Sequence, residues 1–298
     1  MIFYLYDIII NMDTNNSTKK GIICIIASAF FFSLMFLFIK LTGDVPTLQK
    51  CFFRNFFALV IAVVALLRAK VPFRIGKGNT KYLVGRSLAG GIGMVCNFYA
   101  IDYCNAISDA SILNKLSPFF AIIFSIFILK EIAKGTDWLA VICAFTGALF
   151  VIKPTFSSAS IPTIAGAIGG MGAGLAYTLV RKLGMRKENS MIIVAFFSGF
   201  TTLMLLPNLI FNYTYMTPVQ WLYLCFTGLA AALGQIFITK AYSYAPAKEI
   251  SVYDFSIVVF SAIWGFMFLS QIPDVYSVIG YIIIIGTAVT RWYMSTSK

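Results

Sequence analysis

Ten apolar stretches, each about as long as a membrane-crossing helix, follow one another along most of this chain. An α-helix needs about 20 residues, each rising about 1.5 Å, to cross about 30 Å of hydrocarbon. Because backbone hydrogen bonds cannot go to water in lipid, we expect every stretch to be helical. The sequence therefore predicts an all-α, polytopic membrane protein with ten transmembrane helices. The stretches are 21–41, 46–68, 82–101, 107–129, 136–153, 162–181, 190–211, 217–240, 247–269 and 275–293.

The composition agrees with a membrane protein and argues against a nucleic-acid-binding one. The 298 residues are 60% hydrophobic and 11% charged, whereas soluble domains have about 45–50% and about 25%. The net charge of +12 comes from basic residues in short segments between apolar stretches, as the positive-inside rule requires. We therefore expect the lipid bilayer and a small-molecule substrate to be the partners, and no nucleic acid.

The chain offers little for catalysis or metal binding. It contains no histidine, and its six cysteines form no CxxC pair. Histidine is the commonest metal ligand and a common general base, and a buried free cysteine behaves as a small hydrophobe. We expect no metal, no cofactor and no catalytic residues, so the chain is not predicted to be an enzyme.

Residues 1–20 form a short N-terminal tail before the first stretch. The apolar segment Ile2 to Ile10 is too short to cross a membrane and lacks the basic region of a signal peptide. We favour a misassigned start, with Met12 as the initiator, over a segment that lies on the membrane surface.

Basic residues orient the stretches. With the N-terminus inside, 18 basic residues fall on the inner side, Arg86 among them, and three fall on the outer side. The asymmetry predicts both termini in the cytoplasm. Arg54 and Lys115 belong to neither side because they fall within apolar stretches.

The stretch from Asp109 to Glu131 has an echo from Glu249 to Gln271. Each copy is the fourth of five stretches, and because five is an odd number, the second copy enters the membrane from the opposite side. We therefore predict two inverted five-helix repeats, residues 21–153 and 162–293, an arrangement that secondary transporters use repeatedly, with the substrate site between the halves. The matched pairs are Asp109 with Glu249, Ser111 with Ser251, Asn114 with Asp254, and Glu131 with Gln271.

Glycines gather in the third and sixth stretches, in the segments GRSLAGGIGM and GAIGGMGAGLAY. Small residues at these spacings let helix backbones approach closely. Static packing and a sliding face for a rocking motion are both open interpretations of this pattern.

Three segments resemble the EamA-type ten-span transporters of the drug/metabolite transporter superfamily: FFRNFFALV (52–60), LNKLSPFFAIIFSIFILKE (113–131) and YDFSIVVFSAIWGFMFLSQIPD (253–274). The resemblance extends from about residue 21 to residue 293. It implies transport, since family members carry amino acids, nucleotide-type metabolites, organic cations or drugs. The family usually ends its ninth span with Glu, where this chain has Gln271, which puts a role for charge there in doubt.

Ionisable groups inside apolar stretches are the first candidates for a binding site, because each costs roughly 2.5–3.5 kcal/mol at a helix centre without a partner or a wet cavity. Arg54 is a candidate anchor for a substrate carboxylate or phosphate; a salt bridge to Asp109 or Asp254, or snorkelling to the surface, is equally open. Asn114 and Lys115 precede Pro118, which is expected to kink the helix and free backbone carbonyls beside a cavity.

Further candidates lie in both predicted repeats. Asp254, with Tyr253 beside it, matches Asn114 in the first repeat and is a candidate proton carrier, or else the counter-ion of Lys115. Glu131 is expected to act as a gate or strut by pairing with Lys134 or with a basic loop of the other half. The remaining substrate-binding candidates are Asn97, Tyr99 and Gln235.

The sequence thus favours a secondary transporter that moves a small polar metabolite, an amino acid or related zwitterion or anion, across the cell inner membrane by alternating access. Proton coupling and exchange are both open. The alternative is export of drugs or nucleotide-type metabolites; an intramembrane enzyme and a non-transporting scaffold are more distant. We expect a monomer or homodimer.

Overall fold

The computed structural model describes residues 17–103, 113–153, 161–270 and 272–296, and these ranges contain only helices and their connections. Residues 1–16, and with them the proposed start at Met12, lie outside the described ranges. The first helix begins at Ser17 rather than at residue 21, so the last four residues of the expected tail belong to it.

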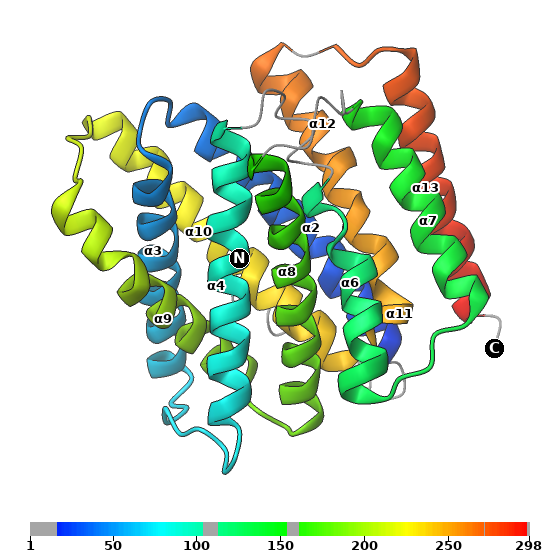
Figure 1. Cartoon of the computed structure of the whole chain (residues 1–298), viewed down its shortest axis with the longest axis horizontal. Coiled ribbons are helices and arrows are strands. Elements are labelled where there is room, and N and C mark those ends of the chain that lie inside the picture. The colour runs from blue at the N-terminus through cyan, green and yellow to red at the C-terminus, as the bar shows by residue number, and fades with distance from the viewer. Residues whose placement is uncertain (1–16, 104–112, 154–160, 271, 297–298) are drawn as a thin grey trace.

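Most expected stretches correspond to one helix each (Figure 1). Eight helical segments of the described part are long and apolar enough to cross a membrane. Arg86, Asn97 and several glycines make α4 less apolar, while α6 and the π-helical turn after it are short. The uninterrupted helices are α2 (Ser17–Leu41), α3 (Thr47–Arg68), α4 (Thr80–Tyr103), α7 (Gly135–Ile152), α8 (Ile161–Met185), α9 (Ser190–Phe211), α10 (Pro218–Tyr244) and α13 (Val275–Thr296).

The fourth and ninth expected stretches are interrupted helices. In the fourth, the backbone turns at Lys115 and Leu116, after which α6 (Ser117–Phe124) and a π-helical turn (Ser125–Leu129) follow. In the ninth, α11 (Ala247–Ile250) and a 3₁₀ turn (Ser251–Phe255) precede α12 (Ser256–Leu269). The echo in the sequence therefore corresponds to two breaks at related positions.

The helix contacts repeat when the two halves are exchanged. Helix α4 packs on α8 as α10 packs on α2, and α6 packs on α8 as α12 packs on α2. The pairs α3 with α9 and α7 with α13 join the halves at opposite flanks of the molecule (Figure 1). This pattern is what a two-fold relation between the halves produces.

Glycines set the closest approach between α4 and α8. A Cβ atom added at Gly172 would lie 2.7 Å from the Ala89 carbonyl oxygen and 2.8 Å from Cα of Gly93. One added at Gly169 would lie 3.0 Å from Cβ of Asn97. The prediction of close backbone packing is confirmed for these positions, and it holds α8 against the face of α4 that carries Asn97.

Candidate functional site

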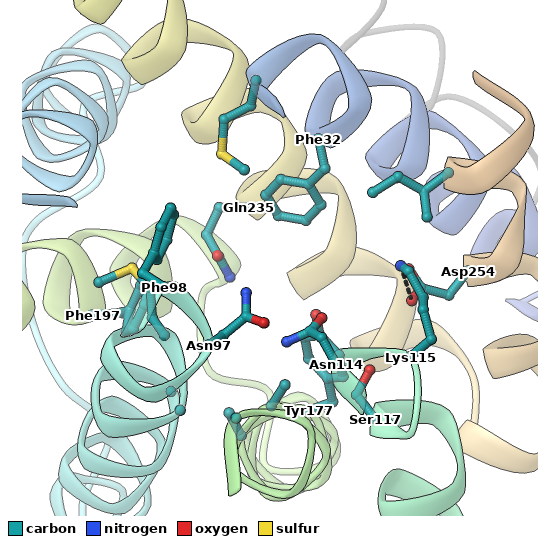
Figure 2. Close-up of a pocket in the computed structure, with 18 of the residues that line it drawn as sticks. Phe32, Asn97, Phe98, Asn114, Lys115, Ser117, Tyr177, Phe197, Gln235 and Asp254 are labelled. Atoms are coloured by element: carbon teal, nitrogen blue, oxygen red, sulfur yellow. Dashed lines mark ion pairs between the residues drawn. The ribbon is translucent and has the colours of Figure 1, made fainter. Parts of the chain in front are cut away.

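A polar cavity of about 130 Å³ lies between the two halves. This volume is roughly ten times what a single water molecule needs. The amides of Asn97, Asn114 and Gln235 face into the same space (Figure 2). Helices of both halves supply the polar and charged lining: Arg54, Arg86, Asn97, Asn114, Lys115 and Ser117 from the first, and Tyr177, Gln235 and Asp254 from the second.

The two helix breaks place an ion pair at this cavity. Lys115 lies at the turn before α6, and Asp254 lies in the 3₁₀ turn before α12. Their Nζ and Oδ2 atoms are 3.8 Å apart, and both side chains are largely buried (Figure 2). The pairing that the sequence left open between Lys115 and Asp254 is therefore present, at a distance longer than a hydrogen bond.

The cause of the first break differs from the expected one. Pro118 does not kink the interior of a helix; it lies in the first turn of α6, directly after the break. A first-turn residue has no intrahelical partner for its N–H, so proline is tolerated there. The break itself falls at Lys115 and Leu116, which puts the lysine beside the new helix start.

Two arginines line the cavity without an acidic partner among the described residues. Arg54 of α3 is 8% exposed, and its Nε and Nη1 atoms donate to the sulfurs of Met35 and Met94 at 3.1 and 2.9 Å. Arg86 of α4 is 2% exposed, and its guanidinium lies 3.5 Å from the ring centre of Phe197. Arg54 does not pair with Asp254, and Asp109 lies outside the described residues.

Arg86 is the principal cavity residue that the sequence did not single out. Counting charges assigned it to the inner side, but it lies within α4 and is fully buried. The available signal was its position inside the expected stretch 82–101. Counted from the start of α4 at Thr80, Arg86 lies about 9 Å along the helix by helical rise. Tyr177, stacked on Tyr242 with ring centres 4.8 Å apart, was also missed.

The other candidates lie away from the cavity. Tyr99 is 41% exposed and lines a separate groove with Asn208 and Tyr213. Tyr253 is buried next to Asp254 but does not line the cavity. Glu131 pairs with Arg181 of the other half, with 3.2 Å between Oε1 and Nε, rather than with Lys134.

Another ion pair lies just before α13 begins. Asp274 accepts hydrogen bonds from Lys153 and from the backbone N–H of Ser277. The hydrogen bond from Lys153 is the main cause that lowers the pKa of the Asp274 carboxyl to about 2. Asp274 thus provides a stable charge three positions after Gln271 in the sequence, and Gln271 itself lies outside the described residues.

Within the described ranges, no group of three or more cysteine, aspartate or glutamate side chains is placed to hold a metal ion. The charged groups at the cavity are instead suited to binding a polar molecule through hydrogen bonds and ion pairing.

Comparison with known protein families identifies the family to which this architecture belongs. The model of the EamA-like transporter family matches residues 19–153 and again residues 161–291, which together are most of the chain. The chain belongs to the EamA-like transporter family. This family is part of the drug/metabolite transporter superfamily, so the protein is a multi-pass membrane protein related to transporters.

Several relatives of this EamA-like protein have names that refer to transport. The pseudopaline exporter CntI of Pseudomonas aeruginosa is 31% identical over 273 residues, which cover 90% of this chain and 94% of that protein. Human solute carrier family 35 member G1 is 27% identical, covering 93% of this chain and 80% of that protein. A crystal structure of another protein, 14% identical, superposes with a TM-score of 0.80 over 91% of this chain and 95% of that one, and shows the fold alone.

The two family matches divide the EamA-like chain between α7 and α8. Arg54, Arg86 and Lys115 belong to the first match, whereas Gln235 and Asp254 belong to the second. The cavity is therefore built from both matched segments.

Proposed function

We propose that this protein is a secondary transporter that moves a small polar metabolite across the cytoplasmic membrane by alternating access. The observation that carries the proposal is the cavity itself, which charged and amide side chains from both halves line. A substrate bound there contacts both halves, so its binding energy acts on their relative position. Interrupted helices beside the cavity are a recurrent feature of such carriers.

Export is the direction that we propose, because the relative from Pseudomonas aeruginosa is named as an exporter. The proposal also places both termini in the cytoplasm, on the strength of the asymmetry in basic residues. Coupling to protons or to exchange of a second solute provides the energy.

Uptake into proteoliposomes tests this function. Radiolabelled amino acids and small carboxylic acids are offered with and without a proton gradient, and with unlabelled solute inside to detect exchange. We expect at least one labelled compound to accumulate in liposomes that contain the protein. Absence of accumulation under every condition, with folded protein, would contradict the proposal.

A matched pair of variants links transport to the cavity. Asn97→Trp fills the space into which Asn97 points, whereas Tyr99→Trp changes an exposed residue two positions further along the same helix. We expect the first variant to lose transport and the second to keep it. Equal transport by both variants would place the route elsewhere.

A further inference from the structure

The cavity has an unequal balance of charges. Among the described residues that line it, Arg54, Arg86 and Lys115 are basic and Asp254 alone is acidic. With all four ionised, this lining has an excess of two positive charges. A buried excess of this size is unfavourable without a compensating anion, because an isolated charge loses its hydration on burial. Both surplus positive charges belong to residues that line the cavity.

The two surplus charges are Arg54 and Arg86, since Lys115 faces Asp254. The Nε and Nη1 atoms of Arg86 are buried and have no hydrogen-bond partner in the described part of the chain. Phe197 contacts the face of the guanidinium through a cation–π interaction, which does not satisfy the N–H donors at the edge of its plane. Within the described ranges, Arg54 donates only to thioether sulfurs, which are weak acceptors that an oxygen anion can replace.

We propose that Arg54 and Arg86 bind the acidic groups of a small organic dianion, and that this dianion is the class of substrate carried. The inference rests on the transport function proposed above. A planar guanidinium presents paired N–H donors that match the two oxygens of a carboxylate or of a phosphate group. Helices α3 and α4 each supply one of these two arginines to the cavity lining.

The same charges disfavour a zwitterion or a cation. A substrate ammonium needs an acidic partner, and the only carboxylate among the described lining residues, Asp254, already faces Lys115 at 3.8 Å. A zwitterion, with a net charge of zero, would also leave the net excess of two positive charges unchanged. A dianion neutralises the cavity and requires no rearrangement of the ion pair.

A charge series of equal chain length tests the proposal. Glutarate, 5-aminovalerate and cadaverine share a five-carbon skeleton and carry net charges of about −2, 0 and +2. Binding to the full chain in lipid nanodiscs is measured by calorimetry and by the shift in melting temperature. Hydrogen phosphate and succinate, added separately, distinguish a phosphate site from a carboxylate site. We expect glutarate or one of these two dianions to bind more tightly than the zwitterion and the diamine.

Substitutions of arginine by glutamine locate the site. Arg86→Gln and Arg54→Gln are each expected to weaken binding of the dianion at least tenfold, which corresponds to about 1.4 kcal/mol. Arg74→Gln is the matched control, because Arg74 is exposed in the segment between α3 and α4 and does not line the cavity. Arg86→Lys, which keeps the charge but loses the fork of donors, is expected to bind with intermediate affinity.

The melting temperature without ligand separates a binding role from a structural one. If Arg86 serves the ligand, Arg86→Gln removes an uncompensated buried charge, and the melting temperature stays the same or rises. A fall in melting temperature with unchanged dianion affinity would overturn the proposal. Equal or tighter binding of 5-aminovalerate or cadaverine, or no binding of any dianion at millimolar concentration, would also overturn it. Uptake of a zwitterion in the proteoliposome assay would leave the transport function standing while the dianion class failed.

Discussion

The ion pair between Lys115 and Asp254 links the two halves at the cavity. Each residue lies at a break in a helix, and the 3.8 Å separation is too long for a hydrogen bond between the charged groups. Two side chains this well buried stabilise each other mainly by compensating charge, because neither is solvated as it would be in water. The pair is therefore expected to contribute stability that depends on both members.

A double-mutant cycle measures this dependence. Asp254→Asn leaves the Lys115 ammonium buried without its counter-ion, and we expect the free energy of unfolding to fall by about 3 kcal/mol. The double variant Lys115→Gln, Asp254→Asn is expected to lose clearly less than the sum of the two single variants. Denaturation of the purified protein in detergent provides the values. Additive losses would show that the two charges do not stabilise each other.

Among the helices, α4 and α8 pack so closely at their glycines that the backbone of the opposite helix leaves no room for a side chain. Cβ atoms at Gly93 and Gly172 would meet backbone of the opposite helix within about 3.2 Å, and backbone cannot turn aside as a side chain can. This contact carries the cavity residues Arg86 and Asn97 on one helix and Tyr177 on the other. The spacing of the helices therefore determines the shape of the cavity.

Substitution by alanine tests the contact. Gly172→Ala places a methyl group 2.7 Å from the Ala89 carbonyl oxygen, so we expect the free energy of unfolding to fall by about 1–3 kcal/mol. Gly286→Ala in α13 is the control, because nothing lies within 4 Å of the added atom, and it is expected to be neutral or slightly stabilising. The same melting temperature for Gly172→Ala and the control would contradict the inferred close packing.

For the whole molecule, polar contacts join the halves at both ends, and one set of them lies at the end that holds Glu131. Besides the pair Glu131–Arg181, Thr18 donates to Glu249 at 2.8 Å, and Asn79 donates to Glu188 at 2.6 Å. Arg291 pairs with Asp137 at the same end. In an alternating-access cycle these contacts must separate when the cavity opens toward that end, so they are expected to stabilise the arrangement observed here.

Removing one contact tests this expectation. In a cysteine-free background, Asn114→Cys reports access to the cavity through its reaction with a membrane-impermeant maleimide. We expect Arg181→Gln to increase labelling from the side that holds Glu131, because the pair Glu131–Arg181 no longer joins the halves. Lys182→Gln is the control, because it removes a neighbouring charge that forms no ion pair with the described residues. Unchanged labelling in Arg181→Gln would show that this pair does not hold the end closed.

The sequence by itself determined the helical class, the approximate spans and the family resemblance, because a chain in lipid must satisfy its backbone hydrogen bonds within each span. It also identified Arg54, Asn97, Asn114, Lys115, Gln235 and Asp254 as candidates, since polar groups are costly in apolar stretches; all six line the cavity.

Only the tertiary structure decided which charges meet. Arg86 looked like an inner-side residue until the packing of α4 against α8 and α9 placed it at the cavity beside Phe197. The partners of a side chain come from helices distant in sequence, so the pairing of Lys115 with Asp254 and the absence of an acid beside Arg54 and Arg86 in the described residues depend on how those helices pack.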